Sequence, residues 1–169
     1  MRFVWGFVFA LVLMLIAALA VTYTGSYNVA ANVPDHPIAK WFLSTNMKQS
    51  VAKQAQSVAS PARLTDEQAR QGARIYKDTC VYCHGAPGKD PGSIGKGLNP
   101  EAVYLPDAVK RWRSAELLWI IKNGIKMTGM ASYGAAHNDD EIWAVVAFIE
   151  RLPNMTPEQY GQMEQASAQ

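Results

Sequence analysis

The sequence predicts an all-α protein, in which a single small helical domain follows an N-terminal apolar helix. Its 169 residues leave room for one domain of ordinary size plus appendages. Several segments carry apolar residues at helical spacing, and capping residues, Gly or Pro flank them. No segment alternates apolar and polar residues as a half-buried strand does, and no internal repeat is present.

The first predicted helix is an apolar block that we assign to a transmembrane anchor within residues 1–24. Residues 3–21 contain no charge, and as a helix they would extend roughly 29 Å, close to the ~30 Å hydrocarbon core of a bilayer. A secretory signal peptide is the alternative, because Ala18-Leu19-Ala20 offers a cleavage motif. The length of the block and the interfacial position of Tyr23 and Tyr27 favour a retained anchor.

The charges that flank this block predict its orientation. Arg2 precedes the block, and Asp35 is the first charge after it. By the positive-inside tendency, the chain beyond about residue 25 then lies on the outer side of the membrane.

Residues 25–61 form a predicted juxtamembrane linker that contains a helix at about 38–58. Trp41 and Phe42 stand near the start of this helix, whereas Lys, Gln and Ala dominate its later part. Three interpretations stay open: the helix lies along the membrane surface, packs against a partner, or is a solvated spacer. Pro61 marks the boundary with the next domain.

The main predicted domain spans residues 62–153. Thr65 and Gln68 form a capping-box pattern ahead of a short amphipathic helix that is predicted to end just before Cys80. Residues 154–169 are predicted to form a short C-terminal helix or tail.

Two more helices are predicted in the second half of this domain. Ser114 is the expected N-cap of one helix, and Gly124 is expected to end it. Asn138 and Glu141 form the capping pattern of the other. The region 85–113 is rich in Gly and Pro without a sustained period, which predicts an irregular loop.

The motif "CVYCH" carries the chemistry of the domain. A redox dithiol requires a preceding strand, and a zinc site requires four ligands, whereas His36 and His137 lie in other segments. Cys80 and Cys83 have the spacing that lets two thiols form thioether bonds with one porphyrin, and His84 follows as a proximal iron ligand. The motif therefore predicts one covalently bound haem c.

A second axial ligand is predicted in the loop "NGIKMTGM". The other methionines lie in the apolar block, at the terminus or outside the domain, which leaves Met127 and Met130. Gly129 would let the backbone approach the porphyrin, which favours Met130. An iron bound by His84 and Met130 has no open position and suits one-electron transfer.

The charge distribution excludes one class of partner and favours another. The net charge is +2, with no basic stripe and no nucleic-acid-reading motif, so we expect no nucleic acid as a partner. We also expect no small-molecule substrate, because an iron with two axial ligands has no open position. If the basic residues of the region 107–130 ring the exposed haem edge, they would steer an acidic redox partner; a solvated basic loop is the alternative. This region has five basic residues, Lys110, Arg111, Arg113, Lys122 and Lys126, and two acidic ones, Asp107 and Glu116.

Residues from about 64 to 152 resemble a class I c-type cytochrome. The residues that carry the resemblance are the motif with its preceding helix, the methionine loop, and a closing helix that contains Trp143 and Phe148. The resemblance implies that the first and last helices cross at Gly72, Tyr76 and Phe148. It also implies that Met130 is the axial methionine.

One position departs from the family pattern. The family usually continues Thr-Gly-Met-Pro, whereas Ala131 follows Met130 here, so the loop is expected to be more mobile. Candidates for the apolar haem pocket are Trp119, Ile121, Ile125 and Tyr133, although core packing alone explains these residues nearly as well.

The predicted function is a membrane-tethered one-electron carrier rather than an enzyme. The N-terminal part of the chain resembles that of bacterial membrane-attached monohaem cytochromes, which implies an inner-membrane protein with a periplasmic haem domain. Expected partners are a terminal oxidase, a quinol–cytochrome c reductase-type complex or a periplasmic dehydrogenase. The alternatives are a fixed haem c subunit of a larger oxidoreductase, and a sensor or peroxidase with an open iron site and His137 as a distal group.

Overall fold

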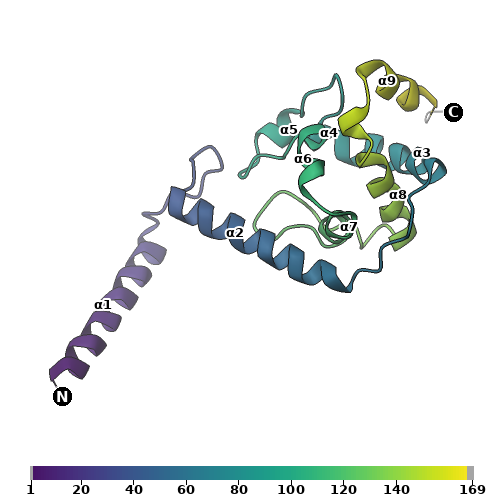
Figure 1. Cartoon of the computed structure of the whole chain (residues 1–169). Coiled ribbons are helices and arrows are strands. Elements are labelled where there is room, and N and C mark those ends of the chain that lie inside the picture. The colour runs from purple at the N-terminus through teal and green to yellow at the C-terminus, as the bar shows by residue number, and fades with distance from the viewer. Residues whose placement is uncertain (1, 167–169) are drawn as a thin grey trace. The chain divides into compact units, whose positions relative to one another are not determined.

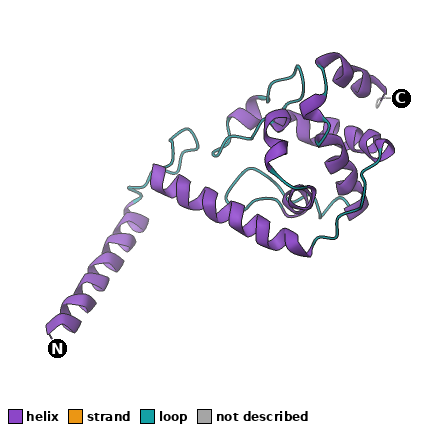
Figure 2. Cartoon of the chain, in the orientation of Figure 1, coloured by secondary structure: helices purple, strands orange, loops and turns teal. Residues whose placement is uncertain are grey.

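The computed structural model describes residues 2–166, and these residues form helices and loops without a strand (Figure 2). This confirms the predicted all-α class. The chain divides between Val33 and Pro34 into two compact units. The first unit contains α1, and the second contains the remaining helices and turns (Figure 1).

Helix α1 spans Arg2–Thr24, and none of its described residues is buried. Its mean hydropathy reaches 2.8 over an 18-residue window, and within residues 2–166 it is the one helix long and apolar enough to cross a membrane. A signal sequence near the N-terminus can also meet this criterion of length and composition.

The second unit begins with α2, at Pro37–Gln54, which continues into a 3₁₀ turn at Ala55–Ser57. The end of α2 and this turn pack against α7, and Val51 and Ala55 are buried there. The predicted helix at 38–58 is therefore present, and its C-terminal part belongs to the packed structure of the second unit.

Helix α3 spans Asp66–Ile75 and starts at the predicted capping box. The Gln68 backbone N–H donates to Thr65 Oγ1 over 3.2 Å, and the Thr65 N–H donates to Gln68 Oε1 over 2.9 Å. The backbone stays helical beyond the predicted end, through a π-helical turn at Tyr76–Cys80 and α4 at Val81–His84.

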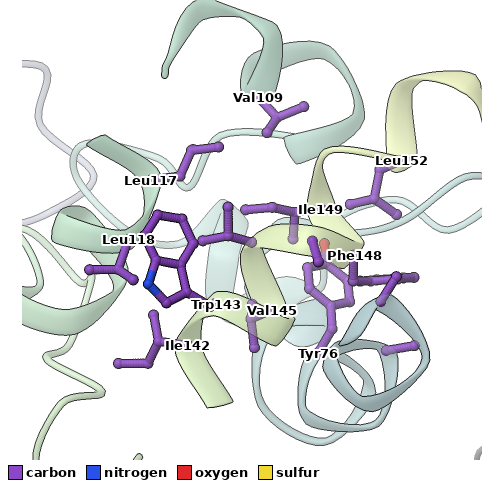
Figure 3. Packing of buried hydrophobic residues seen from close by; sticks show 14 of the residues in the cluster. Tyr76, Val109, Leu117, Leu118, Ile142, Trp143, Val145, Phe148, Ile149 and Leu152 are labelled. Atoms are coloured by element: carbon purple, nitrogen blue, oxygen red, sulfur yellow. The ribbon is translucent and has the colours of Figure 1, made fainter. Parts of the chain in front are cut away.

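Helix α8, at Asp139–Ile149, lies at the centre of the core. All eight residues from Ile142 to Ile149 are buried. Helix α3 packs along one side of α8, and α7 packs on another. Figure 3 shows Trp143 beside Leu118 and the ring of Phe148 beside Tyr76.

Helix α7 spans Ser114–Asn123, and its start differs from the prediction. Ser114 is the first helical residue rather than the N-cap, and its hydroxyl donates to Glu150 Oε1 over 2.5 Å. Arg113 occupies the cap position, where its backbone N–H donates to the Glu116 carboxylate over 2.8 Å. Gly124 ends the helix with a φ of +67°, as predicted.

The region 85–113 contains short helical turns that its irregular sequence did not predict. They are α5 at Ser93–Lys96, α6 at Leu105–Ala108 and a 3₁₀ turn at Val109–Arg111. Their shortness explains the absence of a period, since a single turn repeats no apolar position.

The chain after α8 folds back onto the core. It forms a 3₁₀ turn at Leu152–Asn154 and then α9 at Pro157–Ala166. Tyr160 of α9 is buried and contacts Phe148, with ring centroids 6.4 Å apart. The Lys89 ammonium group lies 2.6 Å from the Glu164 carboxylate, which links α9 to the segment that follows the haem motif.

Candidate haem-binding site

The haem-binding motif lies on the helical backbone that continues α3. Cys80 ends the π-helical turn, and Cys83 and His84 belong to α4. The Thr79 hydroxyl donates to the Ile75 carbonyl over 2.6 Å, which holds the turn ahead of the thiols. Residues three apart on a helix project to the same side, so the backbone presents both thiols to one ligand edge.

The His84 imidazole is oriented by a backbone carbonyl. Its Nδ1 lies 2.8 Å from the Val103 oxygen. Because a carbonyl only accepts, Nδ1 carries the proton, and burial lowers the pKa of His84, which favours the neutral ring. Nε2 then keeps its lone pair, as a metal-binding histidine requires.

Cys80 and Cys83 are partly buried, and no disulfide joins them. Burial raises the pKa of Cys80 to about 11, and its Sγ lies 3.2 Å from the Thr79 hydroxyl. A small cavity beside the Cys80 side chain is lined mainly by apolar residues of α3, α7 and α8, together with Tyr133 and His137.

The two candidate axial ligands in the methionine loop, Met127 and Met130, have different surroundings. The Ile125 N–H donates to the Met130 carbonyl over 3.1 Å, and the Met130 N–H donates to the Thr128 hydroxyl over 3.1 Å. Met130 is partly buried. Met127 has a φ of +61° and is 78% exposed, so it faces solvent at the apex of the loop.

Packing contacts connect this loop to the motif. Gly95 lies against the Cys83 carbonyl, with no space for a side chain between them. A Cβ at Gly129 would lie 2.5 Å from the Leu98 side chain, so Leu98 fills the space beside Gly129. The segment 95–98 therefore touches both Cys83 and the residue before Met130.

The other pocket candidates fall into two groups. Tyr133 and Ile121 line the cavity beside Cys80, and burial, followed by the two cysteines, raises the pKa of Tyr133. Trp119 and Ile125 are partly buried, but among the described residues they line neither this cavity nor the main core.

His137 also lines the cavity. Its ring stacks on Tyr133 with centroids 6.3 Å apart, and its Nδ1 lies 3.5 Å from Glu141 Oε2 without hydrogen-bond geometry. The structure thus places His137 beside Cys80, on the inner side of the domain.

Gly72 and Tyr76 lie where α3 meets α8. A Cβ at Gly72 would overlap the Ala144 carbonyl and lie 2.8 Å from the Val145 nitrogen. The ring of Tyr76 contacts Phe148 at 5.1 Å between centroids. The fully buried Tyr76 hydroxyl donates to the Gly85 carbonyl over 2.5 Å, directly after His84.

Replacing Tyr76 by Phe tests how strongly this hydrogen bond supports the motif. The substitution Tyr76→Phe leaves the buried Gly85 carbonyl without this donor, and we expect a loss of about 1–3 kcal/mol in the free energy of unfolding. Tyr104→Phe is the matched control, because its partly buried hydroxyl donates to Ala86 over 2.9 Å. Equal losses in urea titrations of the two variants would contradict a special role for Tyr76.

The basic residues of the region 107–130 differ in whether they form ion pairs. Arg113 pairs with Glu116 over 2.9 Å, and Lys122 pairs with Asp139 over 2.6 Å. Lys110, Arg111 and Lys126 are exposed and form no ion pair within the described part of the chain.

Sequence reasoning missed three contributors to the site: the Val103 carbonyl, the Leu98 side chain and the Thr79 hydroxyl. Val103 and Leu98 lie in the aperiodic region, where no local pattern indicates a distant contact. Thr79 did carry a signal, since a threonine in a helix can donate to the carbonyl four residues earlier.

Comparison with known proteins finds a family match over the part of the chain that contains these residues. Residues 67–149 match the family model described as cytochrome C oxidase, cbb3-type, subunit III. Dihydro-heme d1 dehydrogenase of Pseudomonas aeruginosa is 30% identical over 87 residues, which cover 52% of this chain but 16% of that protein.

The chain is also similar to photosystem II extrinsic protein V from two organisms. The protein of Trieres chinensis is 25% identical over 122 residues, which are 63% of this chain and 74% of the relative. The protein of Phaeodactylum tricornutum is 27% identical over 113 residues, 58% of this chain and 68% of the relative.

The all-helical fold, the paired thiols and the oriented imidazole fit a protein that carries covalently bound haem. Residues 67–149 form a domain of the class I c-type cytochromes. A domain of this class implies haem c, and it transfers electrons between redox partners.

Proposed function

We propose that this protein is a membrane-tethered one-electron carrier with one haem c, held by Cys80 and Cys83 and ligated by His84 and Met130. The observation that carries the proposal is the 2.8 Å hydrogen bond from His84 Nδ1 to the Val103 carbonyl, which leaves the lone pair of Nε2 available to bind iron. Haem iron between a histidine and a methionine exchanges one electron without opening a coordination position.

The surrounding residues have separate tasks in this proposal. The Val103 carbonyl fixes the tautomer and ring plane of His84. Hydrogen bonds from the Ile125 N–H to the Met130 carbonyl and from the Met130 N–H to the Thr128 hydroxyl hold Met130. Tyr133 and Ile121 exclude water beside Cys80. The exposed cations Lys110, Arg111 and Lys126 attract an acidic partner.

The proposed domain organisation follows from this function. Residues 1–24 are the anchor, 25–61 the linker with its helix, 62–153 the periplasmic haem domain, and 154–169 the C-terminal segment. Helix α1 supports the assignment of the anchor by its length and composition.

Spectroscopy of the purified full-length protein tests the carrier function. We expect one haem per chain that resists acid–acetone extraction, and reduced spectra that carbon monoxide leaves unchanged. Prompt binding of carbon monoxide would contradict a closed iron site and favour a sensor or peroxidase.

A fixed haem c subunit of a larger oxidoreductase is the second candidate function. It is favoured by the matching family model, whose description is that of an oxidase subunit. Purification from native membranes in mild detergent separates the two candidates. A stable complex with fixed stoichiometry supports the subunit, whereas a monomer that exchanges electrons with an added partner supports the carrier.

A further inference from the structure

Helix α2 divides into two parts with different surroundings. Its C-terminal part packs on α7, and Val51 is only 1% exposed. The first two turns carry an exposed group that we call the apolar collar: Ile38, Trp41, Phe42 and Leu43, which are 68%, 66%, 59% and 44% exposed. Consecutive helical residues point about 100° apart, so the collar presents apolar side chains in several directions.

The charge of α2 indicates what covers the collar. The helix contains Lys40, Lys48 and Lys53 and no acidic residue. All three lysines are exposed, and none forms an ion pair within residues 2–166. Aromatic and aliphatic side chains combined with unpaired lysines are typical of helices that bind the surface of an anionic bilayer.

The covalent chain keeps the collar near a bilayer if α1 is an anchor. Twelve residues, 25–36, separate Thr24 from Pro37, and even fully extended they span only roughly 40 Å. Exposed apolar side chains continue along this segment at Tyr27 and Val29. If α1 spans a membrane, the surface of that membrane is therefore within reach of the collar.

We propose that the apolar collar inserts into the interface of an anionic bilayer, with Lys40 and Lys48 at the lipid headgroups. This inference rests on the proposed membrane anchor. Because the C-terminal part of α2 packs on α7, the contact also fixes the orientation of the haem domain at the membrane.

Photocrosslinking identifies what touches the collar. Benzoylphenylalanine replaces Phe42 in the full-length haem protein, or Gln49 as the matched control. Gln49 is exposed and lies two turns further along the same side of α2. We expect lipid adducts at position 42 and not at position 49 after irradiation in vesicles that contain phosphatidylglycerol.

Changes in lipid composition and in the lysines of α2 test whether the contact depends on charge. Adduct yield at position 42 should fall in pure phosphatidylcholine vesicles, and Lys40→Gln with Lys48→Gln should lower the yield in anionic vesicles. Absence of lipid adducts at position 42 would overturn the proposal. Crosslinked dimers in vesicles, or a protein adduct instead of lipid in intact native membranes, would also overturn it.

Failure of the anchor is distinguishable from failure of the collar. The mass of the mature protein shows whether residues 1–24 are retained. If they are removed, the processed protein mixed with the same vesicles still reports whether position 42 contacts lipid.

Discussion

Replacing Met130 by Ala is expected to open the sixth position of the haem iron and to lower its midpoint potential. A thioether stabilises reduced iron, and its loss should lower the potential on the order of 0.1 V or more, within the ~0.8 V range that axial ligands span. The loop should persist, because its hydrogen bonds at Met130 use backbone atoms of that residue. Potentiometric titration and carbon monoxide binding measure the two effects.

Met127→Ala provides the matched control in the same loop. Met127 is 78% exposed at the loop apex, so its removal should leave both the potential and the closed iron site unchanged. If Met127→Ala rather than Met130→Ala admits carbon monoxide, the ligand assignment is wrong.

Replacing Gly72 by Ala is expected to destabilise the domain by about 3 kcal/mol, at the upper end of the usual cost of overpacking. The added methyl would overlap the backbone of Ala144, which cannot rotate away as a side chain can. The substitution must therefore separate α3, whose helical backbone continues into the motif, from α8, which lies at the centre of the core. Denaturant titration followed by circular dichroism measures the loss.

Gly161→Ala makes the same chemical change in a helix where space is open. Apart from its chain neighbours and the backbone of its own helix, no atom of the described residues lies within 4 Å of a Cβ at Gly161 in α9. Alanine should stabilise this helix by about 0.5–1 kcal/mol, through propensity alone. Similar effects of the two substitutions would show that α3 and α8 do not cross closely at Gly72.

The sequence allowed prediction of the features that depend on neighbouring residues. The capping box of Asn138 and Glu141 is present, with hydrogen bonds of 3.0 and 2.9 Å between the two residues. Gly124 ends α7 as predicted, because its positive φ suits glycine. Such signals involve residues only a few positions apart, so they can be recognised from the sequence alone.

Features that depend on tertiary packing could not be predicted in this way. Ser114 has the residue type of an N-cap, yet its hydroxyl contacts Glu150, which is 36 residues away. The Val103 carbonyl contacts His84, which is 19 residues away. Because every residue has a backbone oxygen, the residue type at position 103 gives no sign of this contact. The helical backbone also continues beyond the predicted end before Cys80, through the π-helical turn and α4.

The π-helical turn at Tyr76–Cys80 has a consequence for the evolution of chain length. Gly72 is fixed against α8, and Cys80 follows it on an uninterrupted helical backbone. An insertion or deletion of one residue between them would rotate both thiols by about 100° about the helix axis. We therefore expect insertions and deletions to be confined to loops. The spacing of eight positions between Gly72 and Cys80 should stay constant among functional descendants of this chain.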